Sequence, residues 1–559
     1  MTTFDLFLMR EGRRFEDNVV QSLYGWGASE RLVTSTSRPP RTAEVTIIDV
    51  EKAAAKTLEL MGDDSGIDTI LQPTFLHGDL VARGDVVRRG DDGGWEIVEI
   101  KSSLDKSHRK KVPDLAFTTH VASESVATSP LSAPISSSAL VSVNSSYVSP
   151  GPLSLYSYQD LTSEVEAEIE SMTGDPTSPS SLQSLQSLTK ASSPPPPIPK
   201  IHCGKCPVFS SCVGSSSPSH PLWEFQRLSQ PKLDDLISKA PSLEVADCDP
   251  SVLSASQLSH YTAVKSRSPV VKVPLLQKRL TSLTPPVYYL DFEAVGMLEP
   301  PYEGMRPYET YVTQYSVHVS ESAVPGAGGG EGALLHREYL AEPRKDCRGE
   351  LAGKLVEDLG DKGSIVVYSP YERTQLKKLA LSNPSLSDPI RKVLGRLVDF
   401  EKLIRETVVL PEFRGRTSIK VTLPSLRPAF QEAYAKLAEE TGIADGGAAN
   451  GKMTELIRGD IQGEEAEATK RALLEYCKLD TLAMVEIHKA LWGLLEGESK
   501  KDDTEDEALT TQPGSEQPFC SDLSTLRVVE LKEMLREKNL PVSGKKADLI
   551  ERLQQPPKP

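Results

Sequence analysis

The sequence contains no run of apolar residues long enough to cross a membrane, which takes about 18 such residues in a row. Its first twenty residues also lack the apolar core and small-residue cleavage site of a secretory signal peptide. Cysteine is scarce, with 7 residues in 559, and three of them cluster at 203–212. This usage excludes a disulfide-stapled secreted scaffold and is typical of an intracellular protein with a metal site.

The chain also lacks an excess of positive charge, since 79 acidic residues outnumber 63 basic ones and give a net charge of −16. The whole chain is therefore not an electrostatic nucleic-acid binder, and such binding must come from local basic patches. A chain of 559 residues exceeds one ordinary core, so several domains are expected. The 42 prolines and the serine-rich stretches predict disordered inserts, among them 123–138 and 178–200.

An apolar, β-branched and aromatic run at 287–295 contains two acidic residues, Asp291 and Glu293. Strand alternation places both carboxylates on one face of a buried strand. Two such charges are costly in a core unless something neutralises them, and hard divalent cations prefer carboxylate oxygens. The alternative is a strand end with both acids solvated, and carboxylates further along the chain decide between the two.

Strands and helices follow this run in a regular order, with amphipathic or apolar patterns typical of each type. Strands are predicted at 310–319, 334–342 and 363–369, and helices at 347–360, 371–382 and 471–491. Glu372 lies at a strand-to-helix junction, and Tyr476 and Asp480 share one face of the last helix, four residues apart. Alone, Tyr476 could simply pack and Asp480 could be solvated. Together with Asp291 and Glu293, the set predicts a two-metal site in which Tyr476 orients water.

This ordered set resembles the DnaQ-like, DEDD-type 3′–5′ exonucleases, whose motifs are D-x-E on the first strand, an acid opening a helix and Y-x-x-x-D on a late helix. Aspartate is usual where this chain has Glu372. The resemblance implies an RNase H-like α/β domain at 284–495 that uses Mg²⁺ or Mn²⁺. Asp399 and Lys420 are further candidates for the same cleft, and Arg306 and Gln314 for nucleic-acid contact.

A closer resemblance is carried by DFEA, RPYETYVTQYSVHV, VVYSPYERTQL, SIKVTLPSLRP and YCKLDTLAMV. These blocks look like the family of domains of unknown function 2779, which joins a RecB-like half to a DnaQ-like half. The resemblance covers most of residues 1–495. It implies the fold and a nuclease, but no known substrate.

In the first half, strand-like runs at 80–90 and 94–103 are joined by a glycine- and aspartate-rich turn, which predicts a hairpin. Asp85 lies on the first run, and Glu99 and Lys101 lie on one face of the second. The three resemble the PD-(D/E)XK nuclease core, whose acids bind Mg²⁺ and whose lysine activates water, although E-x-K also occurs by chance in sheets. RecB-type members carry a glutamine on the next helix, where this chain has Thr118 and Thr119.

Three cysteines follow with tight spacing, Cys203, Cys206 and Cys212. Such spacing in a polar, proline-flanked loop predicts a metal site. RecB-type nucleases with an iron–sulfur cluster carry three such cysteines and a fourth before the first helix, but no cysteine precedes Cys203. The cluster could be lost, incomplete, replaced by zinc with His202, or completed by Cys248.

The last segment, 523–555, has two short amphipathic helices joined by a Gly-Lys-Lys turn. It resembles the SAP motif, which implies binding to duplex DNA. Gly544, Lys545 and Lys546 lie at the start of the second helix, where backbone N–H groups and lysines meet phosphate. The alternative is a protein-binding helical hairpin.

The sequence thus predicts a multidomain α/β protein: a PD-(D/E)XK-like domain (1–215) with a Ser/Pro-rich insert, a helical connector (216–283), a DnaQ-like domain (284–495), an acidic linker (496–522) and a SAP domain (523–555). The expected function is that of a metal-dependent nuclease acting on DNA, a 3′–5′ exonuclease that uses two-metal phosphodiester hydrolysis and is tethered to DNA by its SAP domain. The expected location is the nucleus or a DNA-containing organelle. RNA remains open as a substrate. The alternative is a non-catalytic DNA-associated scaffold built from decayed nuclease folds.

Overall fold

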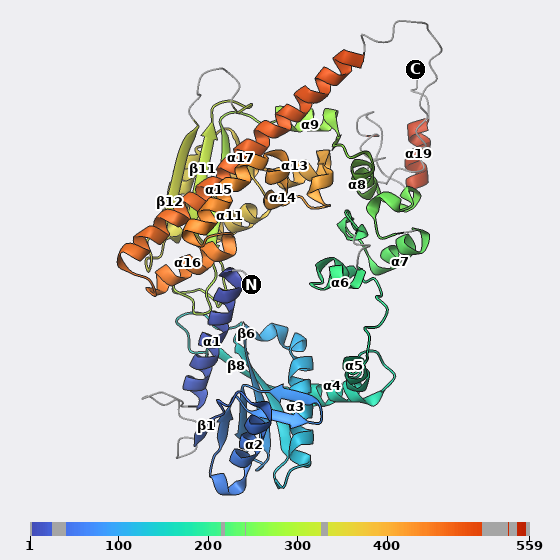
Figure 1. The fold of residues 1–559 in the computed structure, drawn as a ribbon. Coiled ribbons are helices and arrows are strands. Elements are labelled where there is room, and N and C mark those ends of the chain that lie inside the picture. The colour runs from blue at the N-terminus through green and yellow to red at the C-terminus, as the bar shows by residue number, and fades with distance from the viewer. Residues whose placement is uncertain are drawn as a thin grey trace. The chain divides into compact units, whose positions relative to one another are not determined.

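The computed structural model describes residues 3–24, 41–213, 218–240, 242–325, 334–505, 535 and 545–554. The chain divides into two units, Met1–Glu496 and Gly497–Pro559. The first unit holds several sheets and many helices, which confirms the mixed α/β class predicted from the sequence (Figure 1). Among the helices described, none combines the length and apolar character that a membrane crossing requires.

Six strands form the first sheet in the order β1-β2-β5-β6-β7-β8. The strands are β1 (Thr42–Glu44), β2 (Thr69–Leu71), β5 (Val86–Arg89), β6 (Trp95–Leu104), β7 (Ile135–Val143) and β8 (Tyr156–Asp160). A separate two-stranded sheet pairs β3 (Thr74–His77) with β4 (Leu80–Arg83). β5 and β6 are antiparallel around the 90–94 turn, so the predicted hairpin is confirmed.

Helices cover both faces of this sheet because successive strand residues point to opposite sides. The helices are α1 (Thr3–Tyr24), α2 (Val50–Met61), α3 (Val112–Ala127) and α4 (Thr162–Gly174). Ile97 packs into a core with α2, α3 and α4, whereas its neighbour Val98 packs into a core with α1. Phe15 and Val19 of α1 are fully buried in that second core, as their helical spacing predicts.

The predicted disordered insert at 123–138 is wrong, because this segment completes α3 and begins β7, a strand inside the sheet. Ser138 of β7 is buried, and its hydroxyl forms a hydrogen bond with that of Thr119 (2.8 Å). A serine-rich strand can be buried where its hydroxyls find partners. The flexible stretch predicted at 178–200 likewise contains a helix, α5 (Leu182–Thr189).

The segment between the two large sheets is mainly helical, as predicted. Its helices are α6 (Phe209–Val213), α7 (Gln230–Lys239), α8 (Ala255–Ser266) and α9 (Val273–Thr281). Leu222, Phe225, Leu233 and Val245 form its small core. One short strand, β9 (Val270–Val271), pairs with β15 (Val408–Val409) from the second half.

Five strands form the second sheet in the order β12-β11-β10-β13-β14. They are β10 (Val287–Val295), β11 (Tyr311–Ser320), β12 (Leu335–Leu340), β13 (Ser364–Val367) and β14 (Leu397–Asp399). β11 is antiparallel to β10 and β12, whereas β13 and β14 run parallel to β10. The strands at 310–319, 334–342 and 363–369 are therefore confirmed.

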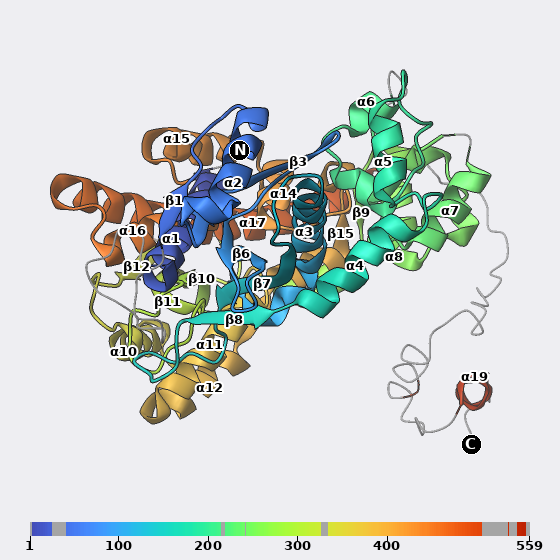
Figure 2. The same ribbon diagram turned by 90° about the horizontal axis from the view of Figure 1, so that it is seen from below.

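The helices of the second half gather on the two faces of this sheet. They are α10 (Arg348–Leu359), α11 (Tyr371–Ser382), α12 (Ser387–Gly395), α13 (Phe400–Thr407), α14 (Ile419–Leu426), α15 (Gln431–Thr441), α16 (Gly446–Arg458) and α17 (Gly463–Glu505). α10, α11 and α12 lie together and share a core with Leu290 and Phe292 of β10 (Figure 2). α13 and α17 share the opposite core with Tyr289, so α17 crosses the face to which Asp291 and Glu293 point (Figure 1).

The two halves of the first unit meet through α1 and α16. Arg458 donates two hydrogen bonds to the carboxylate of Glu11, both of 2.6 Å. Arg10 adds an ion pair with Glu455 (2.8 Å). A bidentate guanidinium–carboxylate pair fixes orientation as well as contact. In the second unit, the structure describes the end of α17, Leu535, and Lys545 with the helix α19 (Lys546–Gln554).

Replacing Gly363 by alanine should lower the free energy of unfolding by about 2 kcal/mol or more, because its φ of +83° disfavours any side chain and a Cβ would lie 2.0 Å from the Pro286 carbonyl oxygen. Gly353 is the matched control, since it lies in α10 and a Cβ added there would have no neighbouring atom within 4 Å. Gly353→Ala should stabilise by about 0.5–1 kcal/mol. Urea unfolding of both variants measures the difference in their free energies of unfolding. Equal midpoints would contradict the expected backbone strain and close contact at position 363.

Candidate metal centre

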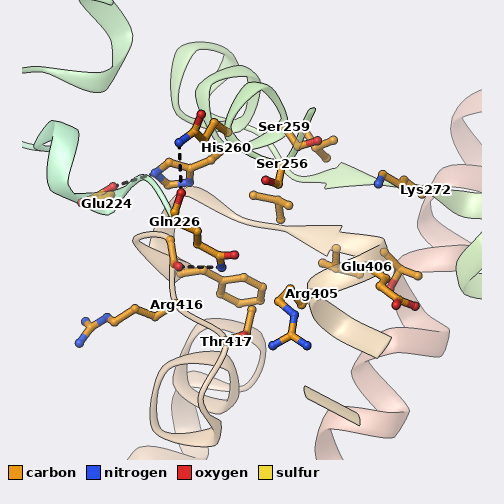
Figure 3. Close-up of a pocket in the computed structure, with 17 residues that line it drawn as sticks. Glu224, Gln226, Ser256, Ser259, His260, Lys272, Arg405, Glu406, Arg416 and Thr417 are labelled. Carbon is orange, nitrogen blue, oxygen red and sulfur yellow. Dashed lines mark hydrogen bonds and ion pairs between the residues drawn. The ribbon is translucent and has the colours of Figure 1, made fainter. Parts of the chain in front are cut away.

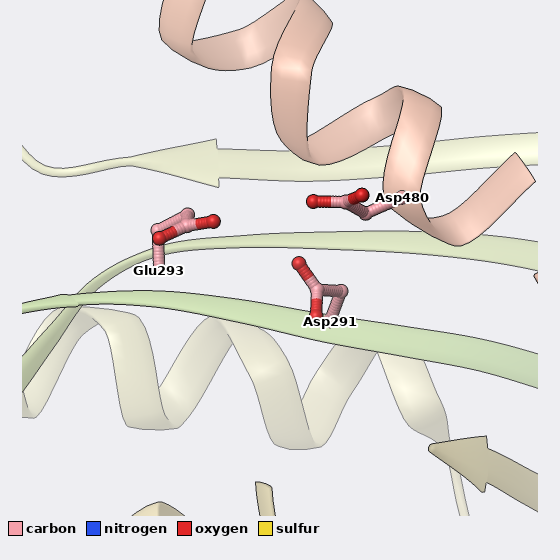
Figure 4. Close-up of side chains that lie close together, drawn as sticks. All are labelled: Asp291, Glu293 and Asp480. Carbon is pink, nitrogen blue, oxygen red and sulfur yellow. The ribbon is translucent and has the colours of Figure 1, made fainter. Parts of the chain in front are cut away.

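The two acidic residues of β10 lie where the strand pattern predicts, on the face that α17 covers (Figure 4). Their neighbours Leu290, Phe292 and Ala294 point to the other side and are buried. Asp291 and Glu293 pair in register with Ser316 and Gln314 of β11, and the register shifts directly after Glu293. The regular strand thus delivers both carboxylates to one face before its pairing is interrupted.

Asp480 of α17 lies against this pair, so three carboxylates converge from segments almost 190 residues apart in sequence (Figure 4). One oxygen from each of Asp291, Glu293 and Asp480 lies within 4.8 Å of the other two. In the part of the chain that the structure describes, this is the only group of three acidic, histidine or cysteine side chains at ligand spacing. All three are partly exposed, so an ion can reach them.

The three carboxyl groups resist ionisation. Burial, followed by the charges of Asp480, Glu293 and Glu372, raises the pKa of Asp291 well above its usual range. Burial and the charges of Asp480 and Glu372 raise the pKa of Glu293 to about 8. Burial also raises the pKa of Asp480 to about 6, although two tyrosine hydrogen bonds and Lys420 act in the opposite direction. Such a cluster gains most from a bound cation.

Glu372 lies in the first turn of α11 and is buried, as its place at the strand-to-helix junction predicts. It is not part of the group of three, but its charge contributes to the raised pKa values of Asp291 and Glu293. Burial raises the pKa of Glu372 itself to about 7, with a smaller contribution from Asp399. Asp399 serves mainly as the N-cap of α13, where it accepts from the Lys402 N–H (2.8 Å).

Two tyrosines hold Asp480. The hydroxyl of Tyr434 donates to Asp480 Oδ1 (2.6 Å), and Tyr476 also hydrogen-bonds to this carboxylate. Burial and the charge of Asp480 raise the pKa of both phenols, so both remain donors at neutral pH. The sequence singled out Tyr476 but missed Tyr434, because Tyr434 belongs to α15 and no motif connects it to α17.

Lys420 and Gly446 lie near the cluster. The charge of Lys420 counteracts the rise in the pKa of Glu293 and Asp480, and its Nζ lies 4.0 Å from Asp445 Oδ2. A Cβ at Gly446, the first residue of α16, would lie 3.5 Å from Glu293 Oε2. The sequence named Lys420 as a cleft residue, and its effect on these two carboxyls agrees with that expectation.

Gln314 does not contact nucleic acid from its position, which corrects the prediction. It is buried in β11, and its amide donates to the Leu473 carbonyl of α17 (2.7 Å). Arg306, the other residue named with it, donates to the Ser145 carbonyl (3.2 Å). Both residues therefore join segments of the chain to one another.

In the first half, Asp85 lies close to Glu99 of β6, but it is not on a strand as predicted, because the run at 80–90 divides into β4 and β5 and Asp85 lies in the bend between them. Asp85 Oδ2 accepts from the Ile100 N–H (2.6 Å), and burial raises the pKa of Asp85 to about 6. Burial and the charge of Asp85 raise the pKa of Glu99 to about 7. Lys101 forms ion pairs with Glu99 and with Asp114, the latter at 3.1 Å. The three predicted residues are thus together, and Lys101 neutralises part of the acidic charge.

The helices beside this group, α3 and α1, supply three further residues that bear on the prediction. Thr118 and Thr119, which are predicted to stand where RecB-type nucleases carry a glutamine, are both buried in α3, and Thr119 bonds to Ser138. Glu16 of α1, which the sequence did not single out, is near enough that the Glu99 charge contributes to its raised pKa, after burial and Asp17. It has a partner in Gln72, whose amide donates to Glu16 Oε1.

The clustered cysteines are free thiols, with Cys203 and Cys206 partly exposed and Cys212 exposed. The residues described do not place these three sulfurs together at ligand spacing. Cys248 is buried in the core around Leu222. A metal at this cluster therefore stays a prediction.

For the SAP segment, Gly544 lies outside the residues that the structure describes. Lys545 and Lys546 stand at the start of α19, where Asp548 Oδ2 accepts from the Lys545 N–H (2.8 Å). Leu535 and Leu549, two leucines of the predicted small core, are fully buried.

The donor set of the second half fits a hard divalent cation. Asp291, Glu293 and Asp480 offer only carboxylate oxygens, which are the ligands that Mg²⁺ and Mn²⁺ prefer. Among the residues described, no arginine contacts these carboxylates to relieve their mutual repulsion. A carboxylate cluster with a purely structural role would need such a partner. These residues can hold a metal ion.

Two families match parts of the chain. Residues 288–418 match the domain of unknown function DUF2779, a span that includes Asp291, Glu293 and Glu372 but not Asp480. Residues 522–555 match the SAP domain, which indicates nucleic-acid binding. No curated protein and no solved structure matches the chain. These two matches agree with the two resemblances, although the DUF2779 match covers residues 288–418 and not most of residues 1–495.

Proposed function

We propose that this protein is a metal-dependent nuclease that acts on DNA, with its catalytic centre at Asp291, Glu293 and Asp480. The observation that carries the proposal is the convergence of these three carboxylates within 4.8 Å, together with their raised pKa values. Carboxyl groups with strongly raised pKa values are typical of functional sites.

The architecture supports an RNase H-like assignment for the second half. The strand order β12-β11-β10-β13-β14 places three antiparallel strands beside two parallel ones, and D-x-E lies on the first of them in sequence. Tyr476 and Asp480 lie on a late helix that crosses the same face. This arrangement resembles that of the DEDD-type exonucleases and favours 3′–5′ removal of nucleotides.

Each residue has a defined task in this proposal. Asp291, Glu293 and Asp480 would hold the metal ions, with Glu372 as a further acid beside them. Bound Mg²⁺ or Mn²⁺ supplies an activated water and stabilises charge on the leaving oxygen. Tyr476 and Tyr434 orient Asp480, and Tyr476 can also position the attacking water.

The SAP domain would keep the acidic body of the protein close to DNA. A chain with a net charge of −16 is repelled by phosphate, and a tethered binding module raises the effective concentration of the substrate. We also propose that the protein works in the nucleus or in a DNA-containing organelle.

The first half would be a second, PD-(D/E)XK-like centre. Asp85, Glu99 and Lys101 lie together, but Lys101 is held by Glu99 and Asp114, and threonines replace the glutamine of the next helix. We assign the main activity to the second half for this reason. Cys203, Cys206 and Cys212 would hold an iron–sulfur cluster or zinc beside this first centre.

The experiment that tests the proposal is degradation of end-labelled oligonucleotides by the full chain. With Mg²⁺ or Mn²⁺, a 5′-labelled DNA strand should shorten stepwise from its 3′ end, and EDTA should stop the reaction. Single-stranded DNA, duplex DNA and RNA are compared at equal concentration. Binding of DNA without any metal-dependent cleavage would overturn the proposal and favour a non-catalytic DNA-associated scaffold.

A further inference from the structure

Three buried residues of α17, spaced four apart, lie against the second sheet: Leu473, Cys477 and Thr481. Residues at this spacing form one stripe along a helix, because four residues complete slightly more than one turn. Asp480 lies beside this stripe, one residue before Thr481, and completes the cluster of three carboxylates (Figure 4). The contacts that hold the stripe in place therefore also hold Asp480.

The first and third positions of the stripe bond to β11. The side-chain amide of Gln314 donates to the Leu473 carbonyl (2.7 Å). The hydroxyl of Thr481 forms hydrogen bonds with Ser316 Oγ (2.8 Å) and with His318 Nδ1 (2.7 Å). Gln314, Ser316 and His318 alternate along β11, so they point to one face of the sheet, and all three are buried. Buried polar groups that satisfy one another specify a single arrangement.

The middle position of the stripe, Cys477, bonds to the carboxylate cluster itself. Its Sγ lies 3.5 Å from Asp291 Oδ2 and 3.9 Å from the Asp291 carbonyl oxygen, and its side chain is fully buried. The thiol is a weak hydrogen-bond donor, and the carboxylate oxygen accepts from it. Asp291 is paired in register with Ser316 of β11, so the contacts of Cys477 and Thr481 fall on neighbouring positions of the sheet.

These contacts leave α17 little freedom to slide along the sheet. One helical turn advances about 5.4 Å, whereas an oxygen of Asp480 lies within 4.8 Å of an oxygen of each carboxylate of β10. A shift of α17 by one turn would therefore take Asp480 out of reach of an ion held by Asp291 and Glu293. The position of the helix along the sheet decides whether the three acids form one centre.

We propose that Cys477 and Thr481 are positioning residues of the metal centre. Thr481 fixes α17 on β11 so that Asp480 meets the two acids of β10, and the Cys477 thiol fixes the orientation of the Asp291 carboxylate. Neither residue binds the metal ion or touches a substrate. The inference rests on the proposed function, because it concerns the same carboxylates. Removing a hydrogen-bond partner of a metal ligand typically weakens metal binding by about 10- to 100-fold.

The test is the affinity of the full chain for Mn²⁺, measured by electron paramagnetic resonance of free and bound Mn²⁺. All proteins, including the reference, carry Glu99→Gln, so that the first half contributes less to metal binding. Two variants lose a donor, Cys477→Ala and Thr481→Val. Two conservative variants keep a hydroxyl donor at the same positions, Cys477→Ser and Thr481→Ser.

Two matched controls remove the same groups from buried positions outside the carboxylate cluster. Cys347→Ala removes a thiol that donates to the Val312 carbonyl (3.6 Å). Thr407→Val removes a hydroxyl that bonds within α13, to the Leu403 carbonyl (2.7 Å). Thr407 lines a hollow between the helical connector and the second half, and none of the three carboxylates is among the residues that line it (Figure 3).

We expect the Kd for Mn²⁺ to rise about tenfold or more in Cys477→Ala and in Thr481→Val. The two serine variants and the two controls should bind Mn²⁺ as the reference does. A purely structural role would lower the melting temperature of variants and controls alike and leave the Kd unchanged. The two positions are changed separately, and thermal unfolding shows that each protein is folded at the temperature of the binding measurement.

Equal Kd values for the reference, Cys477→Ala and Thr481→Val would overturn the positioning role. Equal losses in the controls would overturn it as well, and so would serine variants that bind as weakly as the alanine and valine variants. If the chain binds Mn²⁺ in the expected pattern but cleaves no nucleic acid, the nuclease is rejected and the positioning role stands. If it cleaves DNA while the donor variants bind Mn²⁺ normally, the nuclease stands and the positioning role is rejected.

Discussion

The variant Asp291→Asn should lose metal-dependent cleavage by about 10³-fold or more, while its metal-free form should unfold at a higher temperature than the parent. The activity falls because a metal held by fewer charges stabilises the transition state by several kcal/mol less, and each 1.36 kcal/mol is tenfold in rate. Asp291 is central to the cluster, since the charges of Asp480, Glu293 and Glu372 all raise its pKa.

The melting temperature of Asp291→Asn should rise, because asparagine removes a charge that the neighbouring carboxylates repel. Replacing one member of a repelling cluster relieves the folded state, whereas deleting one partner of an attractive pair destabilises it. The matched control is Asp361→Asn, at an exposed aspartate between α10 and β13 that is not part of the carboxylate cluster. We expect both its cleavage rate and its melting temperature to equal those of the parent.

Cleavage assays and thermal unfolding in EDTA measure the two effects on the same preparation. A variant that loses activity and stability together would indicate that Asp291 has a structural role. If the variant kept its activity, β10 would not belong to the catalytic centre. Cleavage would then have to come from Asp85 and Glu99. The corresponding Glu99→Gln variant distinguishes that case.

The part of the site that sequence could predict depends on local periodicity and on order along the chain. Alternation in β10 places Asp291 and Glu293 on one face, and helical spacing places Tyr476 and Asp480 together. The strands predicted at 310–319, 334–342 and 363–369 follow from the same patterns, whereas β14, which has only three residues, was not predicted. That Asp480 meets β10 requires a resemblance to a known family, because no local rule links positions so distant.

What sequence did not predict depends on contacts between distant segments. Tyr434 reaches Asp480 only because α15 packs beside α17. Composition predicts disorder for the serine-rich start of β7, because composition does not show that a serine such as Ser138 has a hydrogen-bond partner in Thr119. Gln314 can likewise be buried because its side-chain amide donates a hydrogen bond to α17, a contact that the local sequence does not reveal.

Metal binding should stabilise the protein strongly at pH 8 and weakly at pH 5. The pKa values of Glu293, Glu372 and Asp480 lie at about 8, 7 and 6 in the folded chain, above the ordinary value of about 4 for a carboxyl. Between these limits the folded state binds more protons than the unfolded state. The stability that these protons contribute is therefore fully present below about pH 4 and is lost as the pH rises toward 8.

A divalent cation takes the place of these protons, so its affinity should rise through the window in which the carboxyls would otherwise be protonated. At a hundredfold excess over its Kd, the ion adds about 2.7 kcal/mol to the free energy of unfolding. Thermal unfolding with and without Mn²⁺ at pH 5, 6, 7 and 8 measures this gain, and calorimetry in two buffers counts the protons released. The double variant Asp291→Asn, Asp480→Asn is the control, and it should show little gain at any pH. A gain that is equal at pH 5 and pH 8, or that survives in the double variant, would place the metal elsewhere in the chain and leave the four carboxyls as a repulsive cluster without its cation.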